Sequence, residues 1–131
     1  MKNKIIKTHA EDFEFEHVGE FLHDNKYVKK VSYTFYTDEH KQTYKHEKGA
    51  YMLVENKSIV YVGKTNRSII SRMSDHTCTS NIHVKILNSV RNDNKLYIFI
   101  CKNMHGFKPG EVEAMVIGRL LKRNHRLWNR F

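Results

Sequence analysis

Alternation of apolar and polar residues predicts four short strands along the chain. Segment 31–37 alternates valine, tyrosine and phenylalanine with small polar residues, which is typical of a strand with one face in water. Segments 50–54 and 59–62 are rich in β-prone residues and flank a polar tetrapeptide, so they predict a β-hairpin whose turn lies near Asn56. A further apolar run, 96–101, predicts another strand.

Helices are predicted where apolar residues recur every three or four positions. Segments 68–76, 81–91 and 111–123 show this spacing, the last of them most clearly. Segment 10–23 also carries apolar residues at helical spacing, opposite an acidic face, and predicts an amphipathic helix. The polar stretch 38–48 predicts no element. From the hairpin onward the predicted order is β-β-α-α-β-α, preceded by a helix and a strand.

The composition and charge favour a single folded domain that binds nucleic acid. The chain has 131 residues, 40% of them hydrophobic, which is enough for one core. Its 23 Lys and Arg residues against 14 Asp and Glu residues give a net charge of +9 with the histidines neutral. Residues 1–24 carry about −3, so the remainder carries about +12. A basic domain with interleaved aromatic residues is expected on a phosphate backbone, although net charge also serves solubility.

The sequence argues against several other classes of protein. No apolar run approaches the length of a membrane span, and residues 1–7 lack the apolar stretch and cleavage site of a signal peptide. Cys78 and Cys101 stand in neither a metal-ligand spacing nor a disulfide framework. We therefore expect a cytoplasmic protein with two free thiols.

Two short motifs and two further residues resemble the signature of GIY-YIG nucleases. They are Gly49-Ala50-Tyr51, then Tyr61-Val62-Gly63-Lys64-Thr65 ten residues after Tyr51, and then Arg72 and His76. Ala50 replaces the usual isoleucine, and Arg126 stands where many members have proline. Neither departure removes a reacting group.

This resemblance, which covers residues 49–129, implies an α+β fold with a small three-stranded antiparallel sheet flanked by helices. It divides the chain in two. Residues 1–48 would form an N-terminal extension, an acidic helix plus a strand, packed on the core. Residues 49–131 would form the nuclease core. The resemblance is strongest to stand-alone restriction enzymes and small phage endonucleases.

The resemblance also implies a glutamate on the last helix and an asparagine beyond it, which fall at Glu113 and Asn129. Glu113 would hold one divalent ion, Mg²⁺ or Mn²⁺, since hard cations prefer carboxylate and water oxygens. Glu111 competes for this role, but it lies at the helix start, where a carboxylate also interacts favourably with the helix dipole. Asn129 could instead be an amide that only caps a helix or locks a loop.

The remaining roles follow the same resemblance. Tyr51 is the expected general base, with Arg72, Lys64 and the metal favouring its phenolate, because a free tyrosine has a pKa of about 10. His76 would relay or accept the proton, Tyr61 would orient the water or the phosphate, and Arg72 would clamp a phosphate oxygen. The expected catalytic set is Tyr51, Tyr61, Lys64, Arg72, His76, Glu113 and Asn129.

Each of these residues also has an ordinary structural interpretation. Tyrosines on adjacent strands usually pack against each other, and Arg72 and His76, four apart on a helix, could be a solvated pair. Residues that pair across an antiparallel hairpin have residue numbers with a constant sum. If Tyr51 and Tyr61 converge on one site, they must share a face of the hairpin, so this sum must be even. A three-residue turn centred on Asn56 would then place the two tyrosines directly opposite each other, unless a bulge intervenes.

The sequence therefore predicts a metal-dependent endonuclease that cuts double-stranded DNA. A non-catalytic DNA-binding or regulatory protein with the same fold is the alternative. An active site with one metal and one tyrosine base cuts one strand at a time, so cutting both strands requires two copies of the chain or two successive binding events. The simpler solution is a homodimer or higher oligomer, which we predict. Segments 10–23 and 31–37 are the expected contact surface, although the acidic helix could instead shield a basic cleft.

Overall fold

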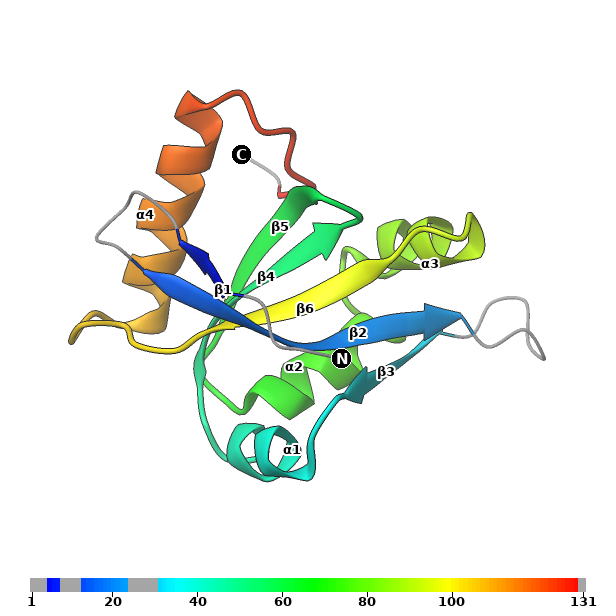
Figure 1. Ribbon diagram of the computed structural model, residues 1–131, viewed down its shortest axis with the longest axis horizontal. Helices are drawn as coiled ribbons and strands as arrows, with labels where there is room; N and C mark the ends of the chain where they lie inside the picture. The colour runs from blue at the N-terminus through cyan, green and yellow to red at the C-terminus, as the bar shows by residue number, and fades with distance from the viewer. Residues whose placement is uncertain (1–4, 8–12, 24–30, 130–131) are drawn as a thin grey trace.

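The chain forms one antiparallel sheet with helices on both of its faces (Figure 1). The computed structural model describes residues 5–7, 13–23 and 31–129. The strands are β1 (Ile5–Lys7), β2 (Glu14–His23), β3 (Val31–Phe35), β4 (Gly49–Glu55), β5 (Ser58–Thr65) and β6 (Leu96–Cys101). The helices are α1 (Asp38–Tyr44), α2 (Ile69–His76), α3 (His83–Arg91) and α4 (Pro109–Lys122). The predicted α+β class is confirmed.

The sheet contains six strands, whereas the family resemblance implied three. Their order is β1-β2-β6-β4-β5, with β3 also paired to β2. Strand β2 therefore lies inside the sheet, where Phe15 pairs with Cys101 and Phe21 with Leu96 of β6. The strand predicted at 31–37 is confirmed as β3. Strand β5 forms one edge of the sheet, and this edge carries the candidate site.

The predicted N-terminal amphipathic helix is wrong, because its described residues form strand β2; residues 10–12 lie outside the described ranges. Phe15 is buried on the face that α4 covers, whereas Val18 and Phe21 are buried on the opposite face. A β-bulge between His17 and Gly19 shifts the pairing with β6 and reverses the alternation of the side chains. The bulge thus creates an apolar spacing of about three residues that imitates a helix.

This strand assignment also bears on the shielding role considered for the acidic segment. A segment that pairs with β6 through most of its length is part of the sheet, and it cannot act as a detachable shield over a cleft. Removing residues 1–24 would expose the hydrogen-bonding edge of β6 and uncover buried phenylalanines such as Phe15. We expect such a deletion to unfold the protein.

The β4–β5 hairpin lies where it was predicted, but its register differs. The turn has two residues, Asn56 and Lys57, rather than three. A bulge follows the turn, and beyond it Tyr51 pairs with Gly63 and not with Tyr61. The expected direct pairing of the tyrosines is therefore wrong. The bulge nevertheless keeps both on one face, with ring centroids 6.1 Å apart.

Helices cover both faces of the sheet (Figure 1). Helix α4 packs on one face through Val112, Val116 and Leu120, which we call the α4 face. Helices α1, α2 and α3 pack on the other, which we call the α2 face. No helix in the described ranges is long and apolar enough to span a membrane.

Helix α1 lies in the polar stretch for which no element was predicted. Thr37 caps it by accepting a hydrogen bond from the His40 backbone N–H at 3.1 Å, and Asp38 and Glu39 lie in its first turn. Only Tyr44 is buried, so the helix has no apolar periodicity to reveal it. Its capping residues were the available sequence signal.

Two glycine substitutions test the packing of this fold with opposite expected signs. A Cβ on Gly19 would lie 2.8 Å from a ring carbon of Phe35 and would overlap the Thr34 carbonyl oxygen. Gly19→Ala should therefore destabilise the protein, because backbone of β3 must move. Gly118, inside α4, has no atom within 4 Å of its would-be Cβ. Gly118→Ala should stabilise by about 0.5 to 1 kcal/mol through helix propensity. Urea unfolding of both variants measures this; a stabilised Gly19→Ala would contradict the close approach of β3.

Candidate active site

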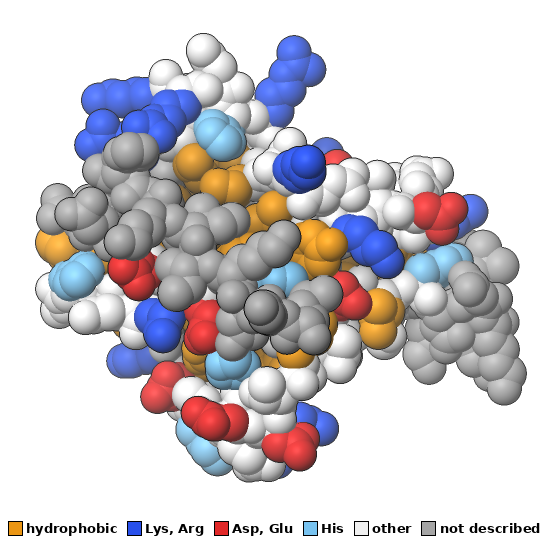
Figure 2. Space-filling view, in the orientation of Figure 1, with side chains coloured by type: hydrophobic (Ala, Val, Ile, Leu, Met, Phe, Trp, Pro, Cys, Tyr) orange, Lys and Arg blue, Asp and Glu red, His pale blue; other side chains and the backbone are white. Residues whose placement is uncertain are grey.

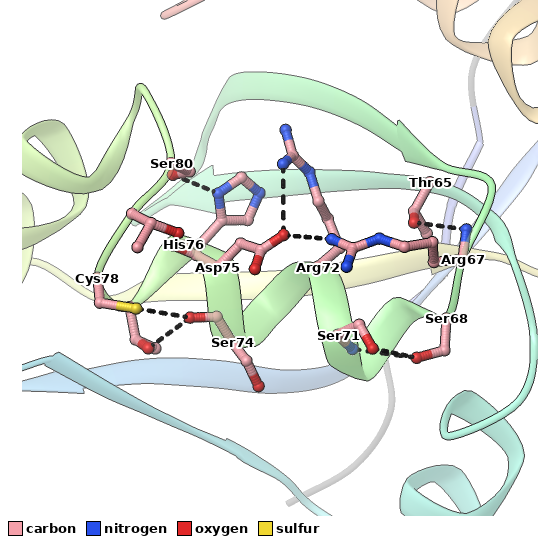
Figure 3. A network of polar contacts seen from close by, with 12 residues as sticks. Thr65, Arg67, Ser68, Ser71, Arg72, Ser74, Asp75, His76, Cys78 and Ser80 are labelled. Carbon is pink, nitrogen blue, oxygen red and sulfur yellow. Dashed lines mark hydrogen bonds and ion pairs between the residues drawn. The ribbon is translucent and has the colours of Figure 1, made fainter.

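Helix α2 presents two predicted site residues on the face that carries Tyr51. The helix begins after Ser68, whose side chain accepts a hydrogen bond from the Ser71 backbone N–H at 3.1 Å. Arg72 and His76 lie four residues apart, which places them on the same side of the helix (Figure 3). The helix therefore directs a cation and an imidazole toward the same part of the sheet.

A buried hydrogen-bond chain joins β4 to α2. The Tyr51 hydroxyl lies 2.6 Å from His76 Nε2, and His76 Nδ1 lies 2.8 Å from the Ser80 hydroxyl. Both Tyr51 and His76 are fully buried. A neutral imidazole accepts at one nitrogen and donates at the other. The imidazole therefore donates to one of these two hydroxyls and accepts from the other.

Tyr61 completes a triangle of rings with this pair. Its ring centroid lies 6.1 Å from that of Tyr51 and 5.8 Å from that of His76. Gly63 allows this arrangement, because a Cβ there would lie 2.5 Å from the Tyr51 hydroxyl oxygen and 2.8 Å from a Tyr61 ring carbon. Only a residue without a side chain fits between the two rings. Steric crowding by the two rings thus explains why the second motif has glycine at this position.

Burial controls the protonation of the pair. It lowers the pKa of His76 to about 3, with a further contribution from the Arg72 cation, so the imidazole is neutral near pH 7. Burial also raises the pKa of Tyr51, and nearby Tyr61 adds to this effect, while Arg72 opposes it. Burial and Tyr61 thus act against the phenolate that neighbouring cations were expected to favour. Desolvation of the buried hydroxyl outweighs the Arg72 charge.

Arg72 is held at the border between this pair and solvent. Its side chain is 29% exposed, and its Nη1 lies 3.8 Å from Asp75 Oδ2. Arg67 binds the same carboxylate oxygen at 2.5 Å (Figure 3). The buried Nε of Arg72 makes no hydrogen bond with any described residue. Arg72 also interacts with Tyr51 and Tyr61, and its ion pair with Asp75 is long, so some of the five N–H donors of its guanidinium remain for an anion.

Glu113 reaches the same region from the α4 face. It lies on α4 and makes no hydrogen bond or ion pair with the described residues. Burial raises the pKa of its carboxyl, while Lys64 and Arg72 act in the opposite direction. Glu111, the competing glutamate, accepts a hydrogen bond from the Lys108 backbone N–H at 2.8 Å and caps the helix. Glu111 is thus occupied structurally, and Glu113 is not.

A cleft of about 530 Å³ lies beside Tyr61 and Glu113, and Lys64, Arg72 and His76 are not among the residues that line it. Tyr61, Glu113 and Asn129 line it, together with Lys85 of α3 and Trp128. Tyr51 is not among its lining residues and lies behind Tyr61. The tyrosine that borders the cleft is therefore Tyr61.

Asn129 ties the C-terminal segment to the edge of β5. Its side-chain nitrogen donates to the Val62 carbonyl at 2.7 Å, and its side-chain oxygen accepts from the Val62 N–H at 3.1 Å. Both polar ends of the amide are engaged by backbone. This geometry matches the interpretation of Asn129 as a residue that locks a loop, and it places the Asn129 side chain at the cleft in a supporting position.

The residues present fit a divalent ion held by a single carboxylate. No group of three or more His, Cys, Asp or Glu side chains in the described ranges is placed to chelate a metal. Glu113 is half-buried at the cleft without a protein partner among those residues, so its charge is uncompensated by a direct contact. Mg²⁺ is commonly bound by one or two carboxylates, with water and substrate phosphate completing its shell. Glu113 is the residue suited to that role.

Three functional-site residues escaped the sequence analysis. Ser80 is hydrogen-bonded to His76, Asp75 forms a long ion pair with Arg72, and Lys85 lines the cleft. Lys85 carried a weak signal, because it belongs to a predicted helix in a basic chain. The contacts of Ser80 and Asp75 depend on the turn after α2, where the Asp75 carbonyl accepts from the Thr79 and Ser80 N–H groups at 2.8 and 2.9 Å. No sequence pattern marks such a turn.

Comparison with known proteins agrees with this geometry. A family model described as the GIY-YIG catalytic domain matches residues 47–126, which is more than half of the chain. No curated protein and no solved structure shows significant similarity to the chain. The matched span contains the hairpin, helix α2 and most of the residues around the cleft. The chain therefore belongs to the GIY-YIG nuclease superfamily.

Proposed function

We propose that this protein is a metal-dependent endonuclease that hydrolyses phosphodiester bonds in double-stranded DNA. One observation carries the proposal: the buried Tyr51–His76 pair packs against the ring of Tyr61, which borders the same cleft as Glu113, a carboxylate with no hydrogen bond or ion pair to the described residues. Hydrolysis requires an oriented water, neutralisation of charge on the phosphate and help for the leaving oxygen. The cleft has residue types suited to each requirement.

Tyr61 and Tyr51 have different parts in this proposal. Tyr61 lines the cleft and is the tyrosine that contacts the attacking water or the phosphate. Tyr51 is fully buried, and its hydroxyl is hydrogen-bonded to His76. It acts as a positioning residue, because its ring and its bond to α2 fix the place of the Tyr61 ring. This assignment moves the general-base role expected of Tyr51 to Tyr61.

Positive charge around the cleft comes from three elements. Arg72 of α2 and Lys64 of β5 both act electrostatically on Glu113, which places them near the carboxylate. Lys85 of α3 lines the cleft itself. In the proposed reaction Arg72 binds a phosphate oxygen and Lys64 adds charge beside the cleaved group. Glu113 would hold one Mg²⁺ or Mn²⁺, which when bound supplies charge neutralisation and an acidified water.

Two copies of the chain would be needed for simultaneous cleavage of both strands. Each chain has one cleft of this kind in its described part, so we propose a homodimer or higher oligomer on DNA. Light scattering at the concentration used for cleavage measures this directly. A monomer that yields only nicked product would contradict it.

Glu113 provides the first test of the enzymatic proposal. Glu113→Gln keeps the size of the side chain but removes the charge that would bind a cation, so nicking of supercoiled plasmid in Mg²⁺ should be abolished while DNA binding persists. Glu111→Gln is the matched control, because its amide oxygen can still accept the hydrogen bond from Lys108. It should nick at nearly the wild-type rate. DNA binding by the wild-type protein without any nicking would instead favour a non-catalytic DNA-binding role.

The two tyrosines provide the second test. Tyr61→Phe should lower the cleavage rate by about 10² to 10⁴ without loss of stability, as expected for removal of a group that assists proton transfer. Tyr51→Phe should leave His76 without its partner and cost about 1 to 3 kcal/mol of stability. Single-turnover cleavage and urea unfolding of both variants separate the effects. A large loss of rate with unchanged stability in Tyr51→Phe alone would restore Tyr51 as the general base.

Acid stability provides a third test, through His76. Its folded-state pKa of about 3 lies below an unfolded value of about 6.5, so the unfolded chain binds a proton that the folded chain excludes. Stability from this group is present above about pH 6.5 and is lost as the pH falls toward 3, by about 1.4 kcal/mol per pH unit. Urea unfolding between pH 7 and pH 4.5 should show a shallower dependence in His76→Gln. Equal slopes would mean that His76 is charged in the folded protein.

A further inference from the structure

A second groove lies beside the cleft, between the β4–β5 hairpin and the segment that follows α4. It measures about 570 Å³. One wall comes from the hairpin, including Glu55 and Val60, and the other from residues 123–128. Figure 1 shows this segment returning from the end of α4 toward β5. Nothing in the proposed reaction at the cleft uses this groove.

The groove and the cleft adjoin each other at a shared lining residue, Trp128. The Trp128 backbone N–H donates to the Val60 carbonyl at 2.5 Å, so the segment is fixed along the edge of β5. Trp128 lines both the groove and the cleft, and its side chain packs partly buried against the core. A chain molecule bound in the cleft and passing Trp128 would therefore enter the groove.

The groove is basic on the side formed by the C-terminal segment. Arg123 and Arg126 are exposed in its wall, and neither is paired with another described residue. Glu55 is the acidic residue among those that line it. Arg119 and Lys122 extend the positive charge along the end of α4. Figure 2 shows Lys and Arg side chains gathered at this end of the molecule, whereas Asp and Glu side chains gather around α1.

We propose that this groove binds the phosphate backbone of the DNA that flanks the cleaved bond, with Arg123 and Arg126 as its phosphate ligands. The inference rests on the proposed function, because it places the flanking DNA relative to the cleft. Arginine forms paired hydrogen bonds with phosphate oxygens, and an exposed arginine without a protein partner loses no existing contact on binding. The open, basic shape suits a charged backbone better than a small apolar ligand.

The salt dependence of DNA binding tests the groove. Binding of the full chain to a duplex is measured without divalent cation, so that no cleavage occurs, over a range of salt concentrations. The double variant Arg123→Gln/Arg126→Gln should reduce the slope of log affinity against log salt by about 1.8, as expected for two lost phosphate contacts. Arg123→Lys/Arg126→Lys should keep most of the slope, which separates loss of charge from a change in folding.

A matched double variant on the far side of the molecule serves as control. Lys41→Gln/Lys45→Gln removes the same charge from exposed positions in and just after α1, among acidic side chains, and should leave the slope nearly unchanged. If Lys41→Gln/Lys45→Gln changed the slope as much as Arg123→Gln/Arg126→Gln, the proposed phosphate binding in the groove would be overturned, because only net charge would then matter. If the wild type nicks plasmid but Arg123→Gln/Arg126→Gln leaves the slope unchanged, phosphate binding in the groove is refuted and the nuclease proposal stands. Absence of DNA binding in the wild type would refute both proposals.

Discussion

The hydrogen bond between the Tyr51 hydroxyl and His76 Nε2 is the contact on which the site depends. Both groups are without exposed surface, so each would lose its hydration on folding without gaining a partner if the other were absent. The bond fixes α2 against the middle of β4. Because Arg72 lies on the same helix face as His76, the position of the cation follows from the same contact. Burial lowers the pKa of His76 and so favours the neutral imidazole in this contact.

An edge strand lets residues from both faces of the sheet meet in one cleft. Along β5, Tyr61 faces the α2 side while Val62 faces the α4 side, and Lys64 shares the side of Val62 by alternation. In the middle of a sheet, groups on the two faces are separated by the sheet itself. At β5 the separation ends, and Glu113 from α4 can share a cleft with Tyr61. The position of this strand at the edge is thus a requirement of the site.

The sequence predicted the elements whose periodicity is regular and failed where it is not. The hairpin, helices α2, α3 and α4, and strand β6 all lie close to their predicted positions. Strand β2 was read as a helix because its bulge at His17 breaks the alternation. For the seven expected site residues, the sequence shows only their order along the chain. Which of them lie close together in space depends on tertiary contacts. The direction of the pKa shift of Tyr51 could not be predicted, because burial, which is its largest cause, depends on tertiary packing.

The C-terminal segment has a further consequence through the bonds of Trp128 and Asn129. An exposed edge strand offers unpaired N–H and C=O groups to any extended chain, which makes it a template for aggregation. The Val60 carbonyl and both backbone groups of Val62 are already occupied by this segment. This part of the β5 edge is therefore closed to pairing with another β-strand. The same short segment that borders the cleft thus also protects the edge strand beside it.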